Sequence, residues 1–129
     1  MNCPSCDVEV VPFDVPAELR EHAPESASAA ALCPRCLTLT TVDAGDSTPA
    51  FERVSTAFPT DVDAAVPLAL AIGLLDSLAL HRASIQTLLE TVERAGTDPL
   101  LVLDRLDVQG STQPAFDLGR RRHQLRQLL

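Results

Sequence analysis

The spacing of hydrophobic and polar residues changes midway along the chain. In the first half the apolar runs are short and alternate with polar residues, which is typical of β-strands. The pattern predicts three strands, at residues 8–13, 37–42 and 50–54, and a helical turn over residues 16–22. The small and polar residues 25–31 predict a loop.

The second half opens with a long apolar segment. Residues 62–80 are apolar almost all round, so we expect a buried helix with Thr60 as its cap. Pro67 falls one or two turns into the segment and is expected to kink the helix or delay its start. Asp76 is a conspicuous charge in this segment and is expected to be buried. We interpret it as a helix cap or as the partner of an arginine, in preference to a polar functional site.

Three shorter helical patterns follow. Apolar residues at i, i+3, i+4 and i+7 predict a second helix that ends at Gly96. Asp98-Pro99 predicts the start of a short third helix, and residues 117–129 predict a terminal helix capped by Asp117. A loop is predicted over residues 110–114. The residues expected to face the core are Ile85, Leu88, Leu89, Val92, Leu100, Leu103, Leu106, Leu118, Leu125 and Leu129.

All four cysteines of the chain lie in two C-P-x-C pairs, Cys3 with Cys6 and Cys33 with Cys36. Two intervening residues let both sulfurs of a pair reach one ion, and proline fixes the turn. Together the pairs predict one structural Zn²⁺ per chain, because four thiolates leave no position open for water or substrate. Iron in the same ligand set and disulfide or redox cysteines are the alternatives.

Left-handed backbone is common directly after such a pair, where glycine is the usual residue. Here the positions hold Asp7 and Leu37. Aspartate tolerates that conformation, whereas leucine does so poorly. We therefore expect the second pair to lead directly into its strand.

These patterns together predict an α+β fold. A three-stranded zinc ribbon is expected over residues 1–57 and a bundle of three or four helices over residues 58–129. The chain has 20 Leu and 17 Ala but four Phe and neither Trp nor Tyr, so the core is expected to be aliphatic. The longest uncharged apolar run, residues 64–75, is far shorter than the roughly 20 residues of a membrane span, and no span is expected.

The charge of the chain is strongly acidic. Its net charge is −8, and all ten basic residues are arginines. A high negative charge without lysine is expected of a protein that stays soluble in a salt-rich cytoplasm. The alternative is a GC-rich genome, whose codons disfavour lysine.

Basic residues outnumber acidic ones only near the C-terminus, where residues 116–129 contain four arginines and one aspartate. This cluster could contact nucleic acid or an acidic partner, or it could neutralise the protein's own acidic body. We favour the second interpretation, because the rest of the chain is strongly acidic; in a salt-rich cytoplasm, screening over ~3 Å at 1 M salt would weaken attraction to phosphate further. The four arginines are Arg120, Arg121, Arg122 and Arg126.

Catalytic signatures are not found in the sequence. It has no glycine-rich phosphate loop, nucleophile elbow or HExxH motif. His22, His81 and His123 are scattered and form no ligand pair at helical spacing, so we interpret each as a surface or interhelical residue. We expect no catalytic residue, no enzyme activity and no small-molecule substrate.

The combined motifs resemble a group of small haloarchaeal zinc-ribbon proteins of unknown function. The resemblance runs the full length and rests on CPSC, PAELREHAPE, CPRC, AVPLALAIGLLDSLALHRASIQTLLETVERAG and RRRHQLRQLL. The two knuckles occur in many unrelated ribbons, whereas GLLDSLAL is more specific. The resemblance implies zinc, halophily and an archaeal cytoplasm, and it transfers no catalytic residue.

The function predicted from these features is a non-catalytic protein-interaction or regulatory module with a protein partner. The alternative is a nucleic-acid-associated or transcriptional accessory protein. Cytoplasmic localisation is expected, because Cys3 and Cys6 stand where a secretory signal would otherwise begin. The orientation of the terminal arginines discriminates between the two functions.

Overall fold

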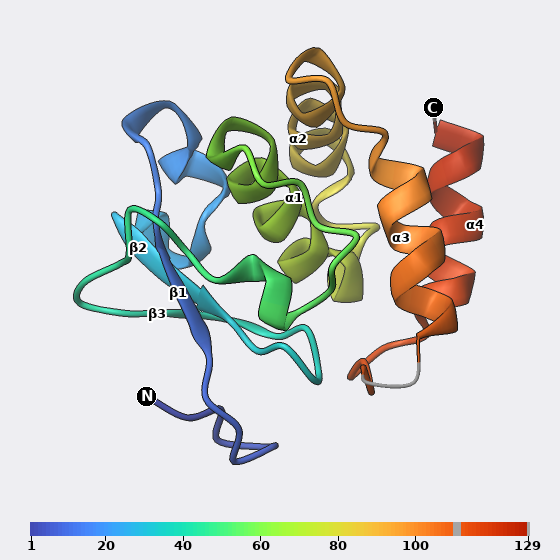
Figure 1. Cartoon of the computed structure of the whole chain (residues 1–129). Coiled ribbons are helices and arrows are strands. Elements are labelled where there is room, and N and C mark those ends of the chain that lie inside the picture. The colour runs from blue at the N-terminus through green and yellow to red at the C-terminus, as the bar shows by residue number, and fades with distance from the viewer. Residues whose placement is uncertain (110–111, 129) are drawn as a thin grey trace.

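The computed structural model describes residues 1–109 and 112–128. Within them an antiparallel three-stranded sheet is followed by four α-helices, so the predicted α+β fold is confirmed (Figure 1). The strands are β1 (Val11–Asp14), β2 (Ala29–Leu32) and β3 (Leu39–Thr41). The α-helices are α1 (Val62–Leu74), α2 (Arg82–Arg94), α3 (Pro99–Val108) and α4 (Leu118–Leu128). The 3-10 helices are η1 (Ala17–His22), η2 (Pro24–Ser26), η3 (Phe51–Arg53) and η4 (Leu75–Ser77).

The central strand of the sheet is β2, because the strand order is β1-β2-β3. Leu32 lies opposite Val11 of β1 and Leu39 of β3. All four residues of β2 are buried. The prediction of a loop over residues 25–31 is therefore wrong at its C-terminal end. Alanine is depleted in strands, but its small side chain allows this strand to be covered on both faces.

The segment predicted as the third strand forms η3 instead. The ring of Phe51 packs against that of Phe13, with 5.3 Å between the centroids. Arg53 donates hydrogen bonds from its guanidinium to the carbonyl oxygens of Glu9 (2.6 Å) and Val10 (3.3 Å). The segment thus contacts β1 and the residues before it through its side chains rather than by pairing as a strand.

The first helix differs from its prediction at both ends. Asp61, not Thr60, is the N-cap, and its carboxylate accepts a hydrogen bond from Asp63 N at 2.9 Å. Pro67 is buried inside α1 without ending it. The hydrogen bond that proline cannot make would have ended on the carbonyl of Asp63, in the exposed first turn. The helix stops at Leu74, and η4 follows instead of a continuous helix.

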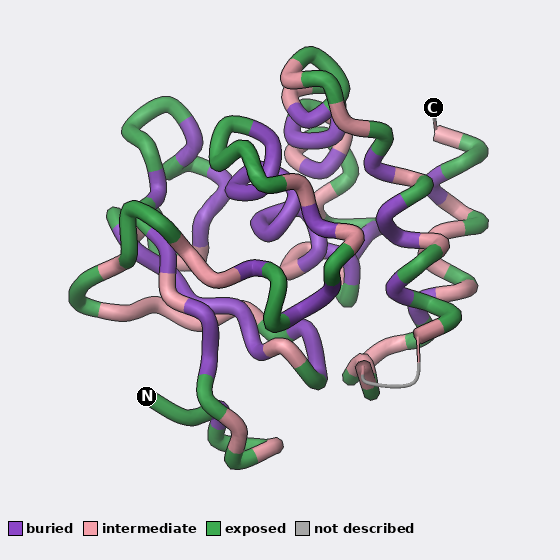
Figure 2. Tube along the Cα trace, in the orientation of Figure 1, coloured by how far each residue is buried: buried purple, intermediate pink, exposed green. Residues whose placement is uncertain are grey.

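One continuous hydrophobic core joins the sheet to all four helices (Figure 2). It contains β1 and β2 side chains from one face of the sheet and the buried side of each helix. Helix α1 approaches β3 so closely that a Cβ at Gly73 would lie 2.6 Å from Leu39 Cβ. The residues predicted to face the core that are buried are Ile85, Leu88, Leu89, Val92, Leu103, Leu106, Leu118 and Leu125.

Two of the predicted core residues have a different outcome. Leu100 is only partly buried against the core, and Leu129 lies outside the described residues. Of the loop predicted over residues 110–114, the structure describes residues 112–114, which lie on the way to α4. The division of the chain at residues 57 and 58 stays a prediction.

Candidate metal centre

The two cysteine pairs lie in matching turns at one end of the sheet. The first turn precedes β1, and the second connects β2 to β3. In each turn the backbone carbonyl of the first cysteine accepts a hydrogen bond from the N–H of the residue four positions later. The N–H of the same cysteine donates a hydrogen bond to the carbonyl of the residue five positions later. The donor–acceptor distances are 2.9 Å for Asp7 N to Cys3 O, 2.8 Å for Cys3 N to Val8 O, 3.1 Å for Leu37 N to Cys33 O and 3.0 Å for Cys33 N to Thr38 O.

These turns bring the four sulfur atoms together. The Sγ atoms of Cys3, Cys6, Cys33 and Cys36 all lie within 4.8 Å of one another, and those of Cys3 and Cys36 are 3.7 Å apart. A tetrahedral zinc ion with Zn–S bonds of ~2.3 Å requires sulfur atoms ~3.8 Å apart. The four thiols therefore fit a metal site with four cysteine ligands, as the sequence predicted.

The surroundings of the sulfurs suit thiolates. Arg35 N and Cys36 N both lie 3.4 Å from Cys33 Sγ and donate hydrogen bonds to it. Thr38 Oγ1 lies 3.1 Å from Cys36 Sγ, so its hydroxyl can donate to this sulfur once the sulfur is ionised. Such groups around a metal site hold the ligands in place and stabilise their charge. Sequence analysis missed Thr38, although its position two residues after the second pair is a usable signal.

The pKa values of the thiols are spread by their surroundings. Burial opposes ionisation of Cys3, but hydrogen bonds from the N–H groups of Ser5 and Cys6 and from the Cys33 and Cys36 thiols lower its pKa to about 7. Burial, together with hydrogen bonding and charge repulsion from Cys33 and Cys36, raises the pKa of Cys6 to about 12. Burial also raises the pKa of Cys33. A divalent cation would offset the repulsion among the four thiolates.

The residue after each pair has a left-handed backbone, with φ of 54° at Asp7 and 62° at Leu37. The expectation that Leu37 leads directly into a strand is therefore wrong. Its side chain is 1% exposed and packs in the main hydrophobic core. Burial of the side chain offsets the cost of the unfavourable backbone conformation.

The segment between α3 and α4 hydrogen-bonds to the second cysteine pair. Gln113 N donates to Arg35 O at 2.7 Å, and Ala115 N donates to Cys36 O at 3.1 Å. These backbone bonds carry no sequence signal, because any residue except proline can make them. The metal centre is consequently attached to the C-terminal helices as well as to the sheet.

Asp76 is exposed, so the prediction of a buried charge is wrong. It lies within η4, which has no side-chain cap hydrogen bond. An arginine does reach this residue: Arg121 Nη2 donates to the backbone carbonyl of Asp76 at 3.2 Å. The contact is with the backbone and not with the carboxylate. Nothing in these contacts assigns Asp76 to a functional site.

Two of the terminal arginines pair with acidic residues of α3. Arg122 lies 3.1 Å from Asp104 and 2.8 Å from Asp107, and Arg126 lies 3.1 Å from Asp104. Arg120 is exposed. Two of the four terminal arginines therefore neutralise acidic residues of the protein itself, as predicted. These pairs connect α3 and α4, which lie side by side in Figure 1.

The three histidines lie in separate elements and do not form a site together. His22 ends η1 and is buried, His81 precedes α2, and His123 is exposed on α4. Among the described residues, the four cysteines are the only group of three or more Cys, His, Asp or Glu side chains close enough to share a metal ion. Within residues 1–109 and 112–128, no helix is both long and apolar enough to cross a bilayer.

The fold and the site define a small α+β protein with a cluster of four cysteines that fits a metal ion. The chain belongs to DUF6276, a family of unknown function, whose model matches residues 2–129. No curated protein and no solved structure matches the chain. The expected membership in a family of unknown function is confirmed, and the family assigns no activity.

Proposed function

We propose that this protein is a non-catalytic zinc-ribbon protein of a halophilic archaeon that acts in the cytoplasm as a protein-interaction or regulatory module. The closed arrangement of the four cysteine sulfurs supports this proposal most directly. A zinc ion held by four thiolates has no vacant position for a substrate or a reactive water. Its role is then to stabilise the fold on which an interaction surface is built.

The identity of the metal is part of the proposal. Iron also binds four thiolates, but the aliphatic composition, with neither Trp nor Tyr, favours zinc over a rubredoxin-like iron site. Purified protein should contain one zinc per chain, and X-ray absorption should show four sulfur ligands. Iron in the purified protein, nitrogen or oxygen ligands, or a disulfide between Cys3 and Cys6 would contradict this assignment.

The second candidate function is association with nucleic acid. The terminal arginines favour it, because Arg120 is exposed and its segment is basic. The ion pairs of Arg122 and Arg126 with α3 oppose it, since these guanidinium groups already have anionic partners. The net charge of −8 also repels phosphate.

A titration with labelled double-stranded DNA separates the two functions. We expect weak, sequence-independent binding at low salt that vanishes at a few hundred millimolar salt. The matched variant replaces the four terminal arginines by glutamine. Tight binding that persists in molar salt and disappears in this variant would replace the interaction-module proposal with the nucleic-acid one.

A protein partner is tested by affinity purification at native salt. The matched control is the Cys33→Ser variant, which removes one buried ligand of the metal centre. The proposal expects a defined protein that co-purifies in constant proportion with the intact chain and is lost with the variant. Failure to recover such a protein at any salt concentration would contradict the proposal that the chain is a protein-interaction module.

A further inference from the structure

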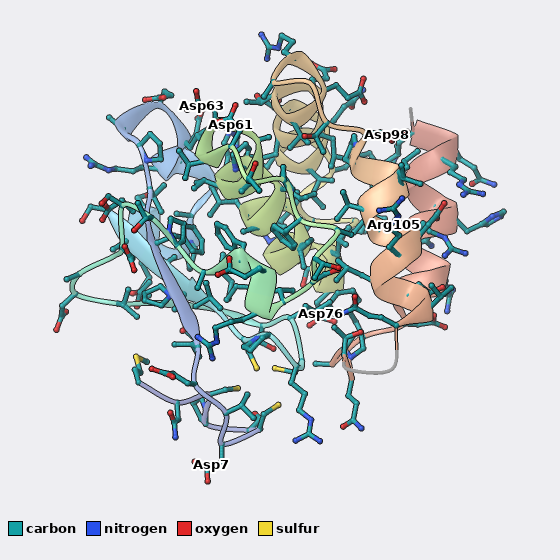
Figure 3. All side chains as sticks on the ribbon, in the orientation of Figure 1. Asp7, Asp61, Asp63, Asp76, Asp98 and Arg105 are labelled. Carbon is teal, nitrogen blue, oxygen red and sulfur yellow. The ribbon has the colours of Figure 1, made fainter. Side chains whose placement is uncertain are left out.

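A large hollow lies on the opposite side of the molecule from the metal centre. It is open to solvent, has a volume of about 820 Å³ and is bordered by η1, the loop at residues 46–49 and the helices α1 and α2. Figure 3 places Asp63, which lines the hollow, at the N-terminal end of α1, far from Asp7 of the first cysteine turn. We call this hollow the acidic groove.

The rim of the acidic groove carries far more negative than positive charge. Among the described residues, the side chains of Asp14, Glu18 and Asp63 make no hydrogen bond or ion pair. Arg94 is the one basic side chain among the described residues that line the groove, and its guanidinium donates hydrogen bonds to the backbone carbonyl of Glu90 and the hydroxyl of Thr91 in its own helix. The five carboxylates are those of Asp14, Glu18, Glu21, Asp46 and Asp63.

The floor of the groove is apolar. The buried side chains of Leu19, Val66 and Pro67 line it. Val62 adds an apolar surface that is 41% exposed at the first turn of α1. An apolar floor beneath separated polar groups is the usual composition of a ligand pocket in proteins. The hollow also falls within the usual pocket volume of roughly 300–1,000 Å³.

A buried histidine with an unpartnered nitrogen lies between the acidic groove and a smaller neighbouring hollow. The side chain of His22, which lines the groove, is only 8% exposed. Its Nε2 lies 3.5 Å from Glu21 Oε1, whereas its Nδ1 is buried without a hydrogen-bond partner. With the proton on Nε2, Nδ1 is an acceptor that lacks a donor. Exposed carboxylates attract cationic N–H donors, so charge complementarity favours a basic ligand at this rim.

We propose that the acidic groove binds a basic, partly apolar segment of a partner protein. Arginine or lysine side chains of the segment would lie on the carboxylates, and an apolar side chain would cover Val62 and the floor. This inference rests on the proposed function as an interaction module and specifies its partner. Charge complementarity excludes nucleic acid from this surface.

Two other ligands fit the groove less well. A metal ion would need several ligand atoms within a few ångströms of each other, and the described carboxylates of the groove form no such group. A free polyamine would satisfy the carboxylates but leave the apolar floor uncovered. A peptide that combines positive charge with apolar side chains matches both parts of the surface.

The test uses the full zinc-loaded chain and a fluorescein-labelled peptide of alternating arginine and leucine. Fluorescence anisotropy is measured at about 0.1 M salt, where charges within ~10 Å still interact. The groove variant is Glu18→Gln with Asp63→Asn. Its matched control is Asp43→Asn with Glu52→Gln, which changes the net charge equally at two exposed acidic residues outside the groove.

We expect the groove variant to weaken peptide binding by about tenfold and the control by less than about twofold, since each lost ion pair contributes modestly. Val62→Ser should also weaken binding of this peptide but not of spermine. Equal weakening by both double variants would show that only overall charge matters and would overturn the proposal. Spermine that binds as tightly as the peptide would overturn it as well.

These outcomes are distinct from those that test the proposed function. A recovered protein partner whose binding is unchanged by the groove variant would refute the groove alone. The interaction-module proposal would then still stand on the co-purification and DNA measurements.

Discussion

Leu37 combines a left-handed backbone with a fully buried side chain, which gives an unusual expectation for its replacement. Its φ is 62°, and its side chain lies in the main core. Replacing it by alanine removes the side chain but keeps a Cβ in the unfavourable conformation. Replacing it by glycine removes both. The two variants therefore separate the contribution of packing from that of the backbone.

The magnitudes follow from these two features. Loss of a fully buried leucine side chain costs about 2–5 kcal/mol in either variant. Glycine relieves about 1–2 kcal/mol of left-handed strain but loses about 0.5–1 kcal/mol through its greater freedom in the unfolded chain. We expect Leu37→Gly to be more stable than Leu37→Ala by about 0.5–1 kcal/mol, from the balance of these terms.

Urea unfolding of zinc-loaded protein, followed by circular dichroism, measures both variants. Leu88 is the matched control, because it is equally buried but lies within the regular helix α2. There the order should reverse, with glycine less stable than alanine by about 1 kcal/mol. If alanine were also the more stable replacement at position 37, the left-handed strain assigned to Leu37 would be refuted.

The metal centre, the α3–α4 ion pairs and Asp76 each give a further expected outcome. Zinc removal by a chelator should lower the midpoint of thermal unfolding by more than about 10 °C, since metal binding contributes on the order of 10 kcal/mol to small zinc domains; an unchanged midpoint would contradict a structural role. Arg122→Gln should cost about 1 kcal/mol in dilute buffer and much less in molar salt, whereas the more exposed Arg126→Gln should cost a few tenths. Asp76→Asn should change the free energy of unfolding by less than about 0.5 kcal/mol, because the residue is exposed; a well-folded variant that loses a partner would give Asp76 a functional role.

The cluster of four cysteines could be predicted from the sequence, because the spacing within each pair indicates metal ligands. Each C-P-x-C pair can present two thiolates to one ion, and two such pairs supply the four ligands of a structural zinc site. The groups around the ligands could not be predicted in the same way. Backbone N–H donors such as those of Gln113 and Ala115 reach the site only through the path of the chain. No side-chain type marks such positions.

The helices were predicted more accurately than the strands. A repeating apolar face, as in α2, is a local signal that survives in the folded protein. By contrast, β2 consists largely of alanine, and its strand conformation depends on the partners β1 and β3. Pro67 shows the opposite effect, because burial of α1 keeps a helix continuous where its local sequence suggested a kink or a delayed start.

The strand β1 runs from the side of the cysteine cluster to the rim of the acidic groove. It begins at Val11, three residues after the first cysteine turn closes at Val8, and it ends at Asp14 on the groove rim. At about 3.3 Å per residue, its four residues span little more than 10 Å. The second cysteine turn is held in the same core by Leu37. A metal ion that orders these turns would therefore also order the start of β1, whose last residue lines the groove. The metal ion would do so without contacting the groove itself.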